Sequence, residues 1–130
     1  MASLASVVVA SSDPERIRML SGLLGSCAVA PILSPSLAEA FEVLKRQPVS
    51  LVVCDDHLVD GSARDLLLEV ARLPSRTPVI VVSVRDDCDY YLEVMEAGAF
   101  DYVAYPADNA EMERVMKNAV AGDGMVAGSA

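Results

Sequence analysis

The sequence is poor in aromatic residues and contains a single histidine. Its 130 residues include no tryptophan, two phenylalanines and four tyrosines. The one histidine, His57, adjoins an acidic loop, so neither a Ser-His-Asp nor a Cys-His catalytic arrangement is available. Hydrolase chemistry of these kinds is therefore excluded.

Positive charge is also scarce. Ten Lys and Arg residues stand against nineteen Asp and Glu residues, which gives a formal net charge of -9. Such a chain repels phosphate backbones and anionic membrane surfaces. We expect no direct contact with nucleic acid and none with a membrane.

Long apolar runs and paired cysteines are missing as well. No stretch approaches the ~18 consecutive apolar residues of a spanning helix, and the N-terminus lacks the basic start and cleavage pattern of a signal peptide. Cys27, Cys54 and Cys88 are odd in number and widely spaced, unlike a disulfide framework or a paired zinc motif. They are interpreted as reduced core cysteines of a cytoplasmic protein.

Short β-branched runs alternate with segments of helical period. Apolar runs at residues 7–10, 51–54 and 79–84 predict strands buried on both faces, and weaker strands fit residues 28–33 and 100–104. Five strands in strict β-then-α order predict an α/β fold, a three-layer flavodoxin-like (βα)5 doubly wound parallel sheet with strand order 2-1-3-4-5.

Capping residues mark where the helices begin. The candidate N-terminal signals are Asp13-Pro14, Ser34-Pro35 or Ser36 with Glu39, Ser62 with Asp65, and Asp108 with Glu111. The composition changes to small residues at the end of the chain. We predict one domain over residues 1–121 and a flexible tail or the start of a linker over residues 122–130.

Ligands of such sheets bind at the carboxyl ends of the first and third strands. After the third strand the sequence reads Cys54-Asp55-Asp56-His57-Leu58-Val59-Asp60-Gly61, which makes Asp55 the leading site candidate. A metal cluster is not assigned to this loop, because adjacent loop residues rarely converge and Cys54-x-x-His57 lacks a second ligand pair.

The same residues resemble the response-regulator receiver domain, the CheY-like family of two-component phosphorelay signalling. In that family the phosphoaccepting aspartate is followed by two variable residues, a Leu or Met and usually a proline, and here Asp55 precedes Leu58 and Val59. The resemblance also rests on two longer stretches, Thr77-Pro78-Val79-Ile80-Val81-Val82-Ser83 and Glu96-Ala97-Gly98-Ala99-Phe100-Asp101-Tyr102. It covers residues 5–121 and implies that Asp55 is the phosphoacceptor.

The resemblance also assigns the residues around the acceptor. It implies that Ser83 is the switch hydroxyl, which hydrogen-bonds the phosphoryl group, and that Tyr102 is the switch aromatic. His57 and Arg85 fall at positions that modulate access to the acceptor and phosphoryl lifetime, and Arg85 is a partial replacement for a missing lysine charge.

Departures from the family pattern remove charge from the site. The family's acidic pair at the end of the first strand is replaced by Ser11 and Ser12. The family's lysine after the fifth strand, which precedes a proline, is replaced by Tyr105, which precedes Pro106. Asp13 is better placed as a helix N-cap than as a metal ligand. We expect no cofactor and at most weak Mg²⁺ binding at Asp55 and Asp13, since this cation prefers carboxylate oxygens.

The sequence is compatible with three functions. The first is an atypical pseudo-receiver that acts through phosphorylation-independent protein–protein interaction and is not an enzyme. The second is a working but inefficient phosphoacceptor, whose only chemistry is self-phosphorylation on Asp55 from a histidine kinase or another phosphohistidine donor. The third, a nucleotide or flavin binder that uses Ser11 and Ser12 at a helix N-terminus, is disfavoured because the loop has no glycine and includes Asp13.

All four tyrosines fall between residues 90 and 105, and clustered tyrosine is typical of protein interfaces. Helical spacing predicts an inward face of Cys88, Tyr91, Leu92 and Met95, which leaves Tyr90 and Val94 on the surface. Tyr90, Val94 and Tyr105 are the predicted interface residues, and the alternative is that the tyrosines are ordinary half-buried residues. The resemblance implies a histidine kinase, a phosphotransfer protein or an output domain as partner, and a homodimer through helix 4, strand 5 and helix 5.

Overall fold

A computed structural model describes residues 6–26, 29, 31–84, 87–105 and 108–129. Five parallel strands form one sheet: β1 (Val7–Ala10), β2 (Pro31–Ser34), β3 (Leu51–Asp55), β6 (Val79–Ser83) and β7 (Asp101–Ala104). Their order across the sheet is β2-β1-β3-β6-β7. Counted along the chain as the first to fifth long strands, this is the predicted order 2-1-3-4-5.

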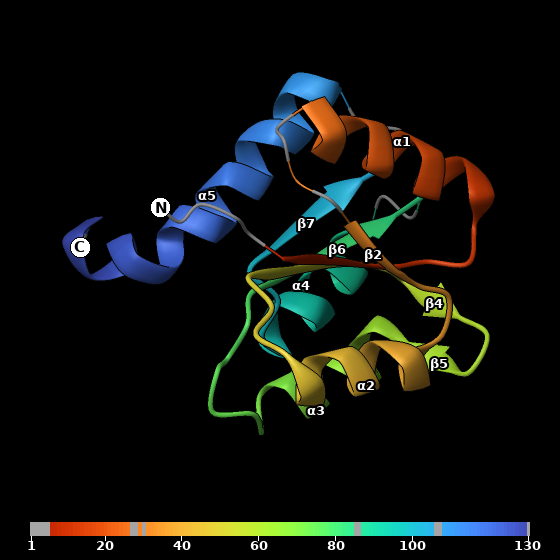
Figure 1. Cartoon of the computed structure of the whole chain (residues 1–130), viewed down its shortest axis with the longest axis horizontal. Helices are drawn as coiled ribbons and strands as arrows, with labels where there is room; N and C mark the ends of the chain where they lie inside the picture. The colour runs from red at the N-terminus through yellow and green to blue at the C-terminus, as the bar shows by residue number, and fades with distance from the viewer. Residues whose placement is uncertain (1–5, 27–28, 30, 85–86, 106–107, 130) are drawn as a thin grey trace.

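Helices cover both faces of the sheet. The helices α1 (Pro14–Ser26) and α5 (Asn109–Ser129) lie together on one side, and α2 (Leu37–Arg46) and α3 (Ala63–Val70) lie on the other (Figure 1). The helix α4 (Cys88–Glu96) packs with α2 and α3, because Val94 and Tyr90 belong to the same buried cluster as Leu37 and Leu66. The predicted three-layer α/β fold is confirmed.

Side chains of each strand alternate between the two halves of the core. Val8 and Val52 pack towards α2, α3 and α4, whereas Val9 and Val53 pack towards α1 and α5. Both sets are buried, since a parallel sheet between two helical layers exposes neither face. This explains why the sequences of the three central strands, β1, β3 and β6, contain apolar runs without polar alternation.

Most of the predicted caps are present. The Ser36 side chain accepts a hydrogen bond from the Glu39 backbone N–H at 3.2 Å, and the Asp13 carboxylate accepts one from the Glu15 backbone N–H at 2.9 Å. The backbone N–H of Ser62 donates to Asp65 at 3.0 Å. The cap of α4 was not predicted: Asp87 accepts from the Tyr90 backbone N–H at 2.7 Å.

The loop after β3 contains a short hairpin that the sequence did not predict. Its strands are β4 (His57–Leu58) and β5 (Gly61–Ser62), which pair antiparallel. Between them, the carboxylate of Asp60 accepts hydrogen bonds from the backbone N–H groups of Leu37, at 2.8 Å, and Ala38, at 3.1 Å. The hairpin is thereby fixed to the beginning of α2.

The end of the chain is helical. The helix α5 runs to Ser129, past the predicted domain limit at residue 121. Whether residues 122–130 act as a linker stays a prediction. Among the described residues, no helix combines the length and the apolar character needed to cross a bilayer.

The predicted orientation of α4 is wrong. Tyr90 and Val94 are buried, at 6% and 0% exposure, whereas Tyr91 and Leu92 are exposed. The apolar residues of α4 form one broad arc that runs from Tyr90 and Val94 round to Cys88 and Leu92, so the helical period does not decide which part of the arc turns inward. The structure turns the side of Tyr90 and Val94 towards the core. Cys88, predicted in the core, is exposed for the same reason, while Cys54 is buried as expected.

Candidate functional site

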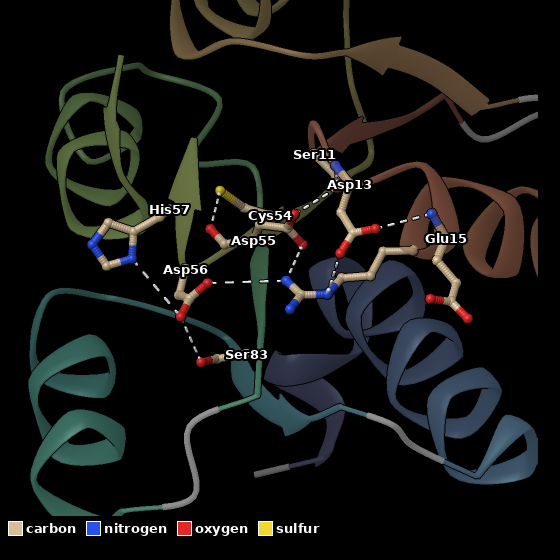
Figure 2. Close-up of polar contacts among 9 residues, drawn as sticks. Ser11, Asp13, Glu15, Cys54, Asp55, Asp56, His57 and Ser83 are labelled. Atoms are coloured by element: carbon tan, nitrogen blue, oxygen red, sulfur yellow. Dashed lines mark hydrogen bonds and ion pairs between the residues drawn. The ribbon is translucent and has the colours of Figure 1, made fainter. Parts of the chain in front are cut away.

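Asp55 is the last residue of β3 and is only 4% exposed. Sheet register pairs Ala10 with Cys54 and Asp55 with Val82, so the residues that end β1 and β6 lie beside it. Ser11 and Ser83 are therefore brought to the same edge of the sheet as Asp55 (Figure 2). This is the location that the sequence predicted for the site.

Ser11 holds one oxygen of this carboxylate. Its hydroxyl donates to Asp55 Oδ2 at 2.5 Å and accepts from the backbone N–H of Asp13 at 3.1 Å. Both Ser11 and Asp55 are buried, whereas Ser12 is exposed. Of the two serines at the predicted acidic-pair positions, only Ser11 is a direct partner of Asp55.

The other oxygen of Asp55 faces a buried arginine that sequence reasoning missed. Arg16, on the first turn of α1, is 8% exposed, and its Nη1 lies 2.9 Å from Asp55 Oδ1. This contact is an ion pair rather than an aligned hydrogen bond, because Oδ1 has no partner in hydrogen-bond geometry. Two more carboxylates surround the guanidinium: Asp56 Oδ1 at 3.9 Å from Nη1 and Asp13 Oδ2 at 3.7 Å from Nε.

Tyr105 packs on the same guanidinium. Arg16 Cζ lies 5.0 Å from the centroid of the Tyr105 ring, within the range of a cation–π contact. The residue at the predicted lysine position therefore contributes an aromatic face to the cation on α1. Tyr105 is half-buried against the cluster formed by α1, α5 and the sheet.

Burial and charge act against each other at this pair. Burial raises the pKa of Asp55, and the hydrogen bond from Ser11 and the charge of Arg16 offset part of that increase. Burial also disfavours the charged form of Arg16, but the carboxylates of Asp55, Asp56 and Asp13 outweigh it and raise the arginine pKa. The positive charge that the site contains is thus a fixed part of the chain.

Ser83 is bonded to the neighbouring acid. Its hydroxyl donates to Asp56 Oδ2 at 2.8 Å, and His57 Nδ1 lies 3.9 Å from the same oxygen (Figure 2). The side chain of His57 is 71% exposed. The structure thus connects the predicted switch hydroxyl to Asp56, a residue to which the sequence assigned no role.

Tyr102 lies at some distance along β7, among other tyrosines. Its ring makes edge-to-face contacts with Tyr90 and Tyr91, with centroids 5.8 Å and 5.9 Å away. Tyr102 is half-buried. Arg85, the other predicted modulating residue, lies outside the described residues. The switch and modulating roles of these residues stay predictions.

A sequence signal for Arg16 was available. Arg16 has the same helical spacing as Leu20 and Leu23, which are buried on the inner face of α1. A charged residue in an apolar stripe must be paired inside the protein. Because the acids after β3 are the nearest candidates in this fold, the apolar stripe of α1 is a signal from which the pair of Arg16 with one of these acids could have been inferred.

The donor set does not fit a resident divalent cation. Within the part of the chain that the structure describes, no three His, Cys, Asp or Glu side chains form a group that could hold a metal ion. Asp13, Asp55 and Asp56 surround the Arg16 guanidinium instead, and a hydroxyl stands at Ser11. A hard cation would have to displace this internal charge before reaching the carboxylates.

Comparison with known proteins identifies the family. The model of the response regulator receiver domain matches residues 7–117, and the chain belongs to this family. It is 26% identical over 113 residues to the response regulator protein PilR of Pseudomonas aeruginosa, which covers 87% of the chain but 25% of the relative. The chain therefore spans about a quarter of the length of the curated relatives it matches.

Solved structures agree on the fold. A putative response regulator from Chloroflexus aurantiacus superimposes with a TM-score of 0.87 at 22% identity, covering 92% of this chain and 99% of the other. The receiver domain of a sensor histidine kinase from Pseudomonas aeruginosa, solved with a magnesium ion coordinated in its active-site cleft, gives 0.82 at 18% identity, with 91% and 98% covered. At these identities the likeness concerns the fold alone.

Proposed function

We propose that this receiver domain is a pseudo-receiver in two-component signalling, which acts by binding proteins without being phosphorylated. The observation that carries the proposal is the ion pair between Arg16 and Asp55. Arg16 supplies from inside the chain the positive charge that a phosphoacceptor site otherwise takes from outside. A site neutralised in this way does not need a cation or a phosphoryl group to be stable.

The chemistry of phosphoryl transfer supports the proposal. The attacking carboxylate must be accessible, and charge on the transferred oxygens must be offset by groups already in place. Here Asp55 is buried, Ser11 binds one oxygen and Arg16 faces the other. Attack by Asp55 requires breaking an ion pair in a buried environment, which is costly because it leaves an unpaired charge.

The neighbouring residues do not restore the missing charges. Ser11 and Ser12 are neutral, and Tyr105 offers a ring and a hydroxyl instead of an ammonium group. At most weak Mg²⁺ binding at Asp55 and Asp13 is part of the proposal, since both carboxylates already have partners. The same charge pattern favours a conformation set by the sequence or by a partner.

The alternative is an inefficient phosphoacceptor that receives phosphate from a histidine kinase. Two observations favour it: Asp55 still ends β3, and the hydroxyl of Ser83 ends the neighbouring strand β6. A swing of Arg16 from the carboxylate to a phosphoryl oxygen would then replace the lysine. Incubation with a cognate phosphohistidine donor distinguishes the two functions, because only this alternative yields a phosphoaspartate adduct by mass spectrometry.

The partners follow from the family. We propose a histidine kinase, a phosphotransfer protein or an output domain as partner, and a homodimer through α4, β7 and α5 as a second mode. Exposed Tyr91, Leu92 and Phe100 lie on or next to α4 and β7 and support this face. Tyr90 and Val94 are withdrawn from it because they are buried. A cytoplasmic location and the absence of direct nucleic-acid and membrane contact stay predictions.

Titration with Mg²⁺ and then with Mg²⁺ plus beryllofluoride, followed by backbone amide shifts, tests the proposal. The parent chain should give no saturable shifts at Asp55, Ser83 or Tyr102. A matched variant with Ser11→Asp, Ser12→Asp and Tyr105→Lys restores the family charges and should respond. Saturable shifts in the parent that spread to Tyr102 would establish a working phosphorylation switch instead.

A second measurement separates binding from phosphorylation. Once a protein partner is in hand, its affinity for the Asp55→Asn variant should equal its affinity for the parent, since the substitution removes the acceptor but keeps its shape. A large loss of affinity that appears only with a phosphohistidine donor present would contradict the pseudo-receiver function.

A further inference from the structure

The edge of the sheet opposite Asp55 is basic in an otherwise acidic protein. Residues 43–50 run from the last turn of α2 into β3, residues 70–78 run from the end of α3 into β6, and together they contain Lys45, Arg46, Arg72 and Arg76. All nineteen Asp and Glu residues of the chain lie outside these two segments. Four of the ten cationic residues are thus concentrated where no carboxylate is present in the sequence.

These four side chains are exposed and have no acidic partner among the described residues. No ion pair within 4.0 Å joins any of them to a residue that the structure describes, in contrast to Arg16, Arg114 and Lys117. The loops that follow α2 and α3 lie on the same side of the molecule, away from the β4–β5 hairpin (Figure 1). Their charges therefore add to a single positive patch.

A groove lies between the two loops. It has a volume of about 530 Å³, and its walls include Leu44, Pro48, Leu73 and Pro74, with Lys45 and Arg46 beside them. Leu44 and Leu73 are only partly covered by the protein itself. A neighbouring hollow of about 340 Å³ on the other side of the second loop includes Arg76 in its lining. Apolar walls and unpaired cations thus occur together.

Hydrogen bonds hold the groove in shape. The buried hydroxyl of Thr77 donates to the backbone carbonyl of Val49 at 3.2 Å, which joins the two loops directly, and it lies 3.2 Å from the hydroxyl of Ser75. Arg76 has a φ of 50°, a left-handed backbone conformation that residues other than glycine rarely adopt. Its backbone N–H donates to the Leu73 carbonyl at 3.2 Å. The local fold maintains strain at a cationic residue of the segment beside the groove.

We propose that this groove binds an acidic segment of a partner protein, with an apolar side chain of the segment between Leu44, Pro48 and Leu73. Carboxylates of the segment then pair with Lys45 and Arg46, and electrostatic complementarity selects an acidic partner over a basic one. The groove lies at the far edge of the sheet from Asp55. Binding there is independent of phosphorylation and does not rest on the pseudo-receiver function.

The probe is a short fluorescent peptide of Glu and Asp residues around a central Leu-Leu pair, titrated into the full chain. Amide shifts should saturate and concentrate in residues 43–50 and 70–78, and affinity should fall steeply with salt. A Lys45→Glu and Arg46→Glu variant should bind roughly tenfold more weakly, since two attractions become repulsions. Arg64→Glu, an equally exposed charge reversal at the other end of α3, should bind like the parent.

Arg76→Gly provides a variant that should stay folded, because glycine relieves the left-handed strain and stability in urea should be at least that of the parent. It removes one charge of the positive patch beside the groove, so the peptide should bind more weakly. Equal binding by a lysine-substituted peptide would overturn the proposal. Tighter binding of a single-stranded oligonucleotide at the same amides would also overturn it and would make the groove a nucleic-acid site. Self-association of the chain through these residues would overturn it in favour of a second copy of the chain as the occupant.

Discussion

Replacement of Arg16 with methionine should destabilise the domain by about 3 kcal/mol at neutral pH. The substitution keeps an unbranched apolar stem on α1 but removes the guanidinium that faces Asp55 at 2.9 Å. Both side chains are almost inaccessible, at 10% and 4% exposure. Breaking one partner of a buried pair costs about 3–5 kcal/mol because it leaves an uncompensated charge. The lower limit applies here, since Ser11 still hydrogen-bonds the carboxylate and Asp55 can accept a proton.

The second half of the test removes the carboxylate charge. Asp55→Asn alone leaves Arg16 close to Asp56 and Asp13, so it should cost less than the arginine substitution. In the double variant both charged groups are absent, so neither is left without its partner. The double-mutant cycle should therefore give a coupling energy of about 2 kcal/mol between the two sites.

The pH dependence follows from Asp55. Its pKa is already raised by burial, and loss of the arginine removes an interaction that lowers it, so the pKa rises further in the Arg16→Met variant. A raised carboxyl pKa gives stability that is complete below the unfolded value and is lost as the pH rises through the folded value. The stability difference between parent and variant should thus be largest at neutral pH and shrink towards acidic pH.

Urea unfolding followed by circular dichroism measures all of these quantities. The m-values of the parent and the three variants should agree, so that differences in midpoint report stability. A cost of Arg16→Met below about 0.5 kcal/mol, typical of an exposed pair, would refute the argument. So would a coupling energy of zero, or a stability difference that grows as the pH falls.

Three further predictions concern the packing around the site. Val94→Ala should cost about 2 kcal/mol in urea unfolding, because it removes two buried methyl groups and leaves a cavity. The exposed control Leu92→Ala should change stability by less than about 0.5 kcal/mol, and equal costs would contradict the orientation of α4. Gly61→Ala should destabilise the domain by about 1–3 kcal/mol, because a Cβ there meets Leu37 Cδ1 and lies 2.8 Å from Asp65 Oδ2. A neutral result in the same assay would contradict this close approach. Asp60→Ala should speed amide exchange at the start of α2, and unchanged exchange would rule out the cap. The hydrogen bond from Leu37 lowers the pKa of Asp60, so the difference between parent and variant should vanish only as the pH falls through that lowered pKa.

The sheet could be predicted because its signals are local. Runs such as Val7 to Ala10 are too short for a helix and lack polar alternation, so they indicate strands buried on both faces. With three such runs and two weaker strands in β-then-α order, handedness leaves few topologies. Asp55 and Ser83 then fall at one edge because parallel strands end there together.

The rest depends on packing that no single segment encodes. The apolar arc of α4 is wider than the face that the helix buries, and only contact with the rest of the core decides that Tyr90 and Val94 turn inward. The apolar stripe of α1 indicates that Arg16 is buried, but its contact with Asp55 follows only once the helix and the sheet are oriented relative to each other. The hairpin after β3 is two residues long on each side, too short to leave a periodic pattern.

The cap that Asp60 places on α2 affects the order in which the protein folds. Its two hydrogen bonds join residues that are 22 and 23 positions apart in the sequence. The first amides of α2 therefore stay exposed to water until the chain beyond β3 has returned to them, at the entropic cost of closing that loop. Although the helix comes earlier in the chain, its beginning and the β4–β5 hairpin should become ordered in the same step.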